Sequence, residues 1–271
     1  MLKVVVCYRL KFSRLDCRFA QLIKSIYLYK RTKIGVLSYI IGMATIGVYD
    51  SGIGGLTTLK ILLEKFAGNN FYYLADNASH PFGNKDEKQL ENIVCDGVCK
   101  LKNNSDYVVL ACNTASTVYK QKDVFKLLPK IPHDTTDCLL LATEFTLEHT
   151  DTGKIETADT RDLASMIEVQ ASINCKKDSL SMNALLPYLA CRLFKFKGVK
   201  KVILGCSHYP YCKKEISTIL GDVDFCDGND CLVGELEKFV APTAEKSNVT
   251  FKFTGGNEEN KYKKILSLLR V

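Results

Sequence analysis

Hydrophobic residues occur along the chain in short runs that end at glycine or polar residues and alternate with stretches of helical spacing. The run Ile46–Tyr49 ends at Asp50, and leucines follow at positions 56, 59, 62 and 63. This order predicts a strand, a turn and a helix. The same alternation predicts strands over 71–75, 107–111, 139–143 and 201–205, and helices over 88–102 and 262–269.

Strands that alternate with helices favour parallel sheets covered on both faces, so the predicted fold class is α/β. The 271 residues, 46% of them hydrophobic and 25% charged, suit one large or two modest domains with a substantial core. Fibrous and low-complexity classes do not fit this composition.

The positive charge is confined to the start of the chain. Residues 1–42 carry nine Lys or Arg and one Asp, whereas 43–271 carry 28 basic and 29 acidic side chains. The body therefore gives no reason to expect a nucleic acid partner.

The apolar stretch before Met43 has about ten residues, too few for a membrane span of roughly 20. Residues 1–42 are interpreted as a basic leader: untranslated if Met43 is the start, otherwise a targeting presequence or a disordered arm.

Twelve cysteines are scattered along the chain without a CxxC pair. A chain of this length needs no disulfide framework, so we expect a reducing, cytoplasmic compartment. The nearest approach to metal-ligand spacing is Cys206, His208 and Cys212, which lacks a second half. No metal site is predicted.

Two of these cysteines follow predicted strands in similar surroundings. Cys112-Asn-Thr ends the strand over 107–111, and Cys206-Ser-His ends the strand over 201–205. Ligands bind at this edge of open α/β sheets, so two such units would place two thiols on either side of one ligand. The alternative is that both are buried core residues.

Two thiols that flank a carbon can invert a stereocentre, because one base removes a proton and an acid returns one on the other face. A helix start or a nearby His can draw a thiol pKa toward neutrality. His208 and Asp50 are candidate helpers of the two thiols. The turn Asp50-Ser-Gly-Ile-Gly-Gly-Leu-Thr can hold a carboxylate at a helix start. It matches neither GxGxxG nor Walker A, which leaves a phosphate loop as a weak alternative.

Four segments, in order along the chain, resemble the signatures of glutamate racemases in the cofactor-independent aspartate/glutamate racemase family. The resemblance is good over 46–120, looser over 139–168 and 199–231, and absent from 1–42. The segments are Asp50-Ser-Gly-Ile-Gly-Gly-Leu-Thr, Tyr73-Leu-Ala-Asp-Asn with Pro81-Phe-Gly, Ala111-Cys-Asn-Thr-Ala and Gly205-Cys-Ser-His-Tyr-Pro.

This resemblance implies two pseudo-symmetric, doubly wound α/β domains with mainly parallel sheets and the active site between them. The first would comprise residues 43–128 with 210–271, and the second, shortened, residues 129–209. It implies interconversion of L- and D-glutamate for bacterial peptidoglycan, without pyridoxal phosphate or a metal, in a cytoplasmic enzyme that can be a homodimer. The expected partner is a small-molecule substrate, with no nucleic acid and no membrane.

The resemblance also assigns roles by position. Cys112, helped by Asp50, would take the α-proton from D-glutamate, and Cys206, helped by His208, from L-glutamate. Substrate would be held by Ser51, Phe82, Gly83, Asn113, Thr114 and Ser207, and Glu168 resembles a further acidic site residue.

The sequence departs from the family at several points. Phe82 stands where Tyr is usual and Ser207 where Thr is usual, both mild changes. The segment between Pro132 and Leu139 is much shorter, which can uncover a strand or displace Cys206. A misplacement of about 1 Å can cost on the order of 100-fold in rate.

Two other functions stay open: a non-catalytic or impaired relative that binds an acidic amino acid, and a racemase for aspartate. The presence of both cysteines favours an enzyme, and the Asp50-Ser-Gly-Ile-Gly-Gly-Leu-Thr form favours glutamate. His80, next to Pro81 in the substrate loop, fits a site residue and a structural histidine equally.

Overall fold

The computed structural model describes residues 42–82, 85–132 and 137–270 and divides the chain into two units, 1–42 and 43–271. All that follows concerns the second unit. The predicted leader, apart from Gly42, lies outside the described residues, and so do predicted site residue Gly83 and the centre of the shortened segment, 133–136.

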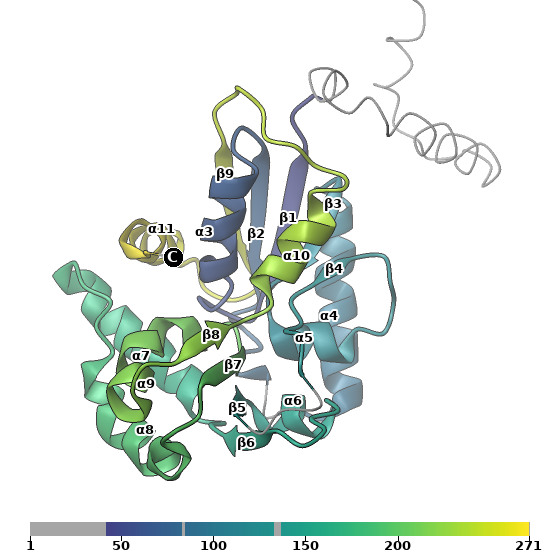
Figure 1. The fold of residues 1–271 in the computed structure, drawn as a ribbon. Helices are drawn as coiled ribbons and strands as arrows, with labels where there is room; N and C mark the ends of the chain where they lie inside the picture. The colour runs from purple at the N-terminus through teal and green to yellow at the C-terminus, as the bar shows by residue number, and fades with distance from the viewer. Residues whose placement is uncertain (1–41, 83–84, 133–136, 271) are drawn as a thin grey trace, which may run out of the picture. The chain divides into compact units, whose positions relative to one another are not determined.

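The first sheet has β1 at its centre, and every described strand pair in it is parallel. Its strand order is β4-β3-β1-β2-β9 (Figure 1). The chain passes from β1 to β2 on one side and then crosses to β3 on the other, so the β1/β3 boundary is a topological switch point. The strands are β1 (Thr45–Asp50), β2 (Asn70–Ala75), β3 (Tyr107–Leu110), β4 (Phe125–Lys126) and β9 (Asn248–Phe253).

The second sheet repeats the core of this order. Its strands are arranged β6-β5-β7-β8, again all parallel among the described residues. Here β5 takes the place of β1 and β7 that of β3, so the second switch point lies between β5 and β7. The strands are β5 (Cys138–Ala142), β6 (Glu156–Asp159), β7 (Lys201–Gly205) and β8 (Asp224–Cys226). The predicted α/β class with two mainly parallel, doubly wound sheets is confirmed.

Helices cover the sheets because successive strand residues point to opposite faces. On the first sheet, Val48 faces a core that includes α3 residues, and Tyr49 faces one that includes α4 residues. The helices are α3 (Leu56–Lys65), α4 (Glu87–Lys102), α5 (Asn113–Val118), α6 (Glu144–Glu148), α7 (Leu163–Asn174), α8 (Leu186–Leu193), α9 (Lys213–Leu220), α10 (Asn229–Leu236) and α11 (Glu259–Leu268), with 3-10 turns η4 (Cys175–Lys177), η5 (Asn183–Leu185), η6 (Phe194–Phe196) and η7 (Tyr209–Cys212).

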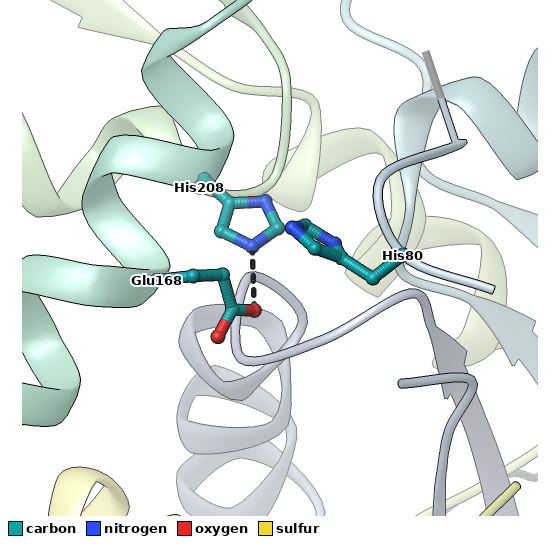
Figure 2. Close-up of side chains that lie close together, drawn as sticks. All are labelled: His80, Glu168 and His208. Atoms are coloured by element: carbon teal, nitrogen blue, oxygen red, sulfur yellow. Dashed lines mark hydrogen bonds and ion pairs between the residues drawn. The ribbon is translucent and has the colours of Figure 1, made fainter. Parts of the chain in front are cut away.

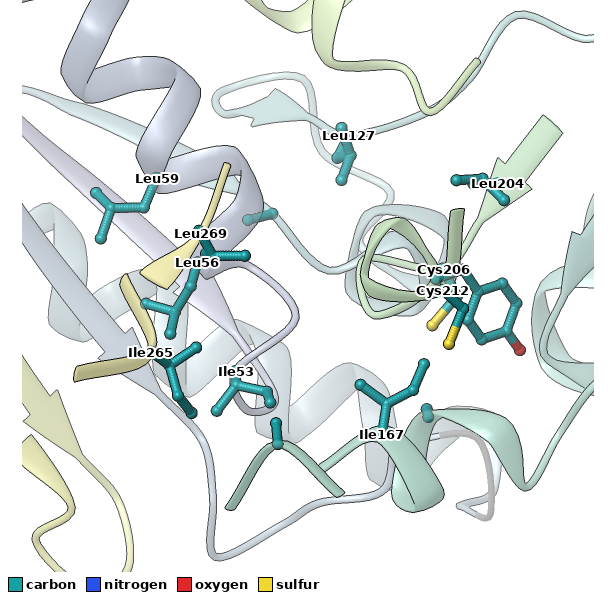
Figure 3. Packing of buried hydrophobic residues seen from close by; sticks show 14 of the residues in the cluster. Ile53, Leu56, Leu59, Leu127, Ile167, Leu204, Cys206, Cys212, Ile265 and Leu269 are labelled. Atoms are coloured by element: carbon teal, nitrogen blue, oxygen red, sulfur yellow. The ribbon is translucent and has the colours of Figure 1, made fainter. Parts of the chain in front are cut away.

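One apolar core joins the two sheets. It includes Ile53 and Leu56 from the first β-turn-α unit together with Ile167 of α7 and Leu204 of β7 (Figure 3). The opposite face of the second sheet has a smaller cluster around Leu140. Strand β5 is nevertheless buried along its whole length, so the short connection before it leaves no bare strand.

The sequence predicted every central strand and none of the edge strands. The five predicted strands match β1, β2, β3, β5 and β7 to within a residue, whereas β4, β6, β8 and β9 all lie at sheet edges. Edge strands are only half covered and so lack the continuous apolar run of a central strand. Because β8 pairs with β7, the second sheet extends beyond the predicted segment 129–209.

No helix in the described part of unit 43–271 is both long enough and apolar enough to cross a membrane.

Two helical glycines test how tightly the first sheet is packed. A Cβ on Gly97 of α4 would lie 2.3 Å from the Tyr49 ring, whereas one on Gly234 of α10 meets nothing within 4 Å. The Tyr49 ring cannot retreat easily, because it is fully buried and its hydroxyl donates to Asp76 at 2.7 Å.

We therefore expect Gly97→Ala to lower the free energy of unfolding by about 1–3 kcal/mol through overpacking. The matched control, Gly234→Ala, should raise it by about 0.5–1 kcal/mol through helix propensity alone. Urea denaturation measures both. Equal stability of the two variants would contradict the packing of α4 on β1.

Candidate active site

The turn between β1 and α3 packs closely against α7 and the residues that follow β7. A Cβ on Gly52 would lie 1.9 Å from Glu168 Oε1, and a Cβ on Gly54 would lie 2.4 Å from Ser207 Oγ. A side chain at either position would force Glu168, or Ser207 and His208, to move, so glycine permits this close approach. The turn's own backbone is used as well, because Ile53 N–H donates to Glu168 Oε1 at 2.6 Å.

Asp50 ends β1 and is fully buried. Its carboxylate accepts hydrogen bonds from Gly52 N–H at 2.8 Å and from Ser207 Oγ at 2.9 Å. Burial raises the pKa of Asp50, and the charge of His208 and these hydrogen bonds offset part of that rise. The Ser207 hydroxyl thus joins the carboxyl end of β7 to that of β1.

Cys112 follows β3 as the N-cap residue of α5 and is 5% exposed. Burial raises its thiol pKa, and the charges of Asp50 and Cys206 raise it further, whereas the N–H groups of Ala115 and Thr114 lower it. The expectation that this thiol pKa is drawn toward neutrality is therefore wrong for Cys112. The helix start is present, but burial outweighs it.

Cys206 follows β7, is 7% exposed, and lies with its Sγ 3.9 Å from His208 Nδ1. The other ring nitrogen of His208, Nε2, lies 3.0 Å from Glu168 Oε1 on α7. Burial opposes charge on His208, but Cys206 and Glu168 together raise its pKa well above 6.5. Burial also opposes charge on Glu168, yet the His208 contact leaves the Glu168 pKa below its ordinary value. Both shifts favour an ion pair between His208 and Glu168, beside the Cys206 thiol.

His80 completes this cluster from the loop before Pro81. Its ring centroid lies 5.6 Å from that of His208, and Figure 2 shows the two rings and Glu168 converging from three parts of the chain. Burial lowers the pKa of His80 to about 4, so the ring is neutral at pH 7. Both of its nitrogens are buried without a hydrogen-bond partner among the described residues.

The other predicted binding residues lie at the same edge of the two sheets. Ser51 and Phe82 are buried, and Phe82 packs against the Tyr49 ring. Asn113 Nδ2 donates to Leu127 O at 3.1 Å. Thr114 Oγ1 lies 3.4 Å from Thr143 Oγ1, which follows β5.

Three residues that the sequence analysis missed support this arrangement. Thr143 follows a strand just as the two cysteines do, and that signal would have found it. The hydroxyls of Tyr73 and Tyr211 donate to the carbonyls of Gly52 and Ile53 at 2.8 and 3.0 Å. Tyr73 lies in one of the four resembling segments but was given no role, and Tyr211 lies in none of them; its contact spans 158 residues.

A cavity of about 480 Å³ reaches the neighbours of both thiols. Its lining includes Asn113 and Gly205, and also the basic side chains Lys120 and Lys126. Leu140 on the thinly covered face of the second sheet lines it too. Cys112 and Cys206 are not among its lining residues.

A comparison with curated proteins decides the family. The chain is 31% identical over 222 residues to the glutamate racemase of Aquifex pyrophilus, covering 74% of this chain and 85% of that protein. The chain belongs to the glutamate racemase family.

Further relatives agree with this membership. The glutamate racemase of Halothermothrix orenii is 26% identical over 249 residues, which is 83% of this chain and 98% of that protein. The glutamate racemase from Francisella tularensis, solved in complex with D-glutamate, shares the fold with a TM-score of 0.68 and 22% identity, over 83% of this chain and 94% of that one. No family model matches the chain.

The Glu168–His208 pair makes a prediction about stability. Glu168→Gln keeps the side-chain shape and removes the charge, so we expect it to cost about 1.5–3 kcal/mol near neutral pH, the range for hydrogen bonds to charged groups. Because the pKa of His208 is raised in the folded protein, its contribution is complete below about 6.5 and is lost as pH rises through the folded value. Because the pKa of Glu168 is lowered, its contribution is lost as pH falls through its folded value.

The difference in unfolding free energy between the two proteins should therefore be largest near neutral pH and shrink on both sides, as urea denaturation across pH would measure. Glu87→Gln is the matched control, since Glu87 pairs with His149 at 3.6 Å on the surface. It should change stability by less than about 0.5 kcal/mol. A loss for Glu168→Gln that does not depend on pH would rule out the charged pair.

Proposed function

We propose that the protein interconverts L- and D-glutamate with Cys112 and Cys206 as its two bases, and without an organic cofactor or a metal. One observation carries the proposal. The thiols occupy equivalent positions after β3 and β7, each at the switch point of its sheet. The Ser207–Asp50 bond joins the end of β7 to the end of β1, and the Thr114–Thr143 contact joins the segment after β3 to the end of β5, so both thiols lie beside contacts between the two sheets.

In the reaction, one thiolate removes the α-proton of glutamate and the other thiol donates a proton to the opposite face. With L-glutamate, the Cys206 thiolate takes the α-proton from one face, and the electron pair remains on the substrate as a carbanion. The Cys112 thiol then gives its proton to the opposite face, which yields D-glutamate, a Cys206 thiol and a Cys112 thiolate. The D-to-L direction runs these steps in reverse.

The electrostatics support this division of roles. His208 Nδ1 lies 3.9 Å from Cys206 Sγ, and the pKa of His208 is raised, which places a proton donor beside this thiol. Burial and Asp50 raise the pKa of Cys112, which keeps it protonated, the state that the L-to-D direction requires. These charges suit proton abstraction from L-glutamate by Cys206. In the opposite direction, Asp50 assists Cys112 when it takes the α-proton from D-glutamate.

Recognition of glutamate uses groups of the turn and of the two strand ends. Ser51, Asn113, Thr114 and Ser207 supply hydroxyl and amide groups, and the backbone at Phe82 and Gly83 supplies further contacts. Basic residues line the neighbouring cavity, which suits an acidic amino acid. Since both thiols are more than nine-tenths buried, we propose that the two sheets separate slightly to admit the substrate.

The cellular role follows from this activity. D-Glutamate made in the cytoplasm would supply peptidoglycan synthesis and so cell shape, and we propose a homodimer as the working form.

The test is α-proton exchange in deuterated buffer, followed by NMR with L-glutamate and D-glutamate offered separately. The unmodified chain should exchange and invert both enantiomers. Cys112→Ser should still exchange L-glutamate, and Cys206→Ser should still exchange D-glutamate. Each variant should lose inversion by roughly 10²- to 10⁴-fold, the typical contribution of a general acid or base.

Cys138→Ser is the matched control, because Cys138 is also buried but begins β5, at the opposite end of a strand from the proposed site. It should retain inversion. If a folded sample exchanges the α-proton of neither glutamate nor aspartate, the racemase proposal is refuted. If it exchanges that of aspartate alone, the substrate is aspartate and not glutamate.

A further inference from the structure

The cluster His80, Glu168 and His208 has the composition of a metal site. Each residue offers one ligand atom, and these atoms all lie within 4.8 Å of one another. Two imidazoles and one carboxylate form a set that binds Zn²⁺, with a water in the fourth position. In a tetrahedral zinc site the ligand atoms lie roughly 3.4 Å apart, so the longest separation here must close by only about 1.4 Å.

His80 supplies the second observation. Both of its ring nitrogens are buried, and neither has a hydrogen-bond partner among the described residues. Buried polar side-chain atoms in folded proteins nearly always have a partner, and a bound ion would supply one to this ring. Its Nδ1 lies over Gly52, where Glu168 Oε1 also lies, so this nitrogen faces the carboxylate.

The surroundings suit a divalent cation. The Glu168 carboxylate lies 3.0 Å from His208 Nε2, and the charge of Asp50 interacts with the same ring. Two positive charges at this point would therefore meet two carboxylates. Residues 77–81, which carry His80, are exposed or half-buried, which gives an ion a route from solvent.

We propose that His80, Glu168 and His208 bind Zn²⁺ and that the bound ion inhibits the enzyme. Zinc on His208 Nε2 replaces the direct contact between this nitrogen and Glu168 (Figure 2). The other ring nitrogen, Nδ1, stays beside Cys206 Sγ. Because the thiol lies on the far side of the ring, it is not a ligand in this geometry. The ion fixes the imidazole beside Cys206 and occupies the Glu168 carboxylate, so neither group is free to take part in the reaction; this inhibitory step rests on the proposed function.

Binding is tested without activity, by titrating the full chain with Co²⁺ as a spectroscopic probe and with Zn²⁺ by calorimetry. We expect visible cobalt d–d bands without the near-ultraviolet charge-transfer band of a thiolate ligand. His80→Ala should weaken Zn²⁺ binding by at least about 10-fold, no less than the loss of an outer-shell partner. His80→Gln, which keeps the volume, should do the same if the alanine variant folds poorly.

His149→Ala is the matched control, since His149 also lies beside a glutamate, Glu87, but on the surface away from the cluster. It should bind Zn²⁺ like the unmodified chain. A thiolate band, equal affinity in the His80 variants, or no binding would each overturn the site.

Inhibition is measured separately, as the Zn²⁺ concentration that halves racemisation. That concentration should rise by at least about 10-fold in His80→Ala and stay unchanged in His149→Ala. Metal binding by a chain that lacks racemase activity would refute the proposed function and leave the site standing. Equal inhibition of the two variants would overturn the inhibitory role.

Discussion

The arrangement of the site depends on how the turn after β1 is tied to the second sheet. Asp50 accepts from Ser207, Ile53 donates to Glu168, and Tyr211 donates back to the Ile53 carbonyl. These bonds are buried or partly buried, where an unsatisfied partner would cost about 1–3 kcal/mol each. The glycines at 52 and 54 leave room for the contact, because a Cβ there would displace the Glu168 or Ser207 side chain. The position of both thiols therefore depends on a turn that carries neither of them.

A repeated strand order gives the two thiols equivalent positions in the two sheets. Both sheets place their first strand beside their third, so each has a switch point where ligands bind. Cys112 follows the third strand of one sheet and Cys206 that of the other. Their surroundings differ: Cys112 has the Asp50 carboxylate, and Cys206 has the charged His208. A symmetric scaffold with unlike neighbours suits one thiol to give a proton while the other takes one.

The sequence alone reached the fold class and the residues that follow central strands. Buried strands such as β7 are continuous apolar runs, and the residue after such a run is easy to place, which is how Cys112 and Cys206 were found. Edge strands such as β9 were missed because half of their residues face outward. The His80–Glu168–His208 cluster was missed as a unit, because its members lie on three separate elements and only folding brings them within 4.8 Å. The pKa values of His80, Glu168 and His208 depend on how deeply each side chain is buried. The spacing of these residues along the chain does not reveal their burial.

A two-base mechanism requires that one substrate carbon lies between two sulfurs. A crystal structure of the protein with D-glutamate bound would show whether it does. We expect the glutamate Cα to lie between Cys112 Sγ and Cys206 Sγ, with one sulfur on each face and the substrate carboxylates against the turn after β1. Glutamate bound with both sulfurs on the same face, or bound away from the two strand ends, would contradict this mechanism.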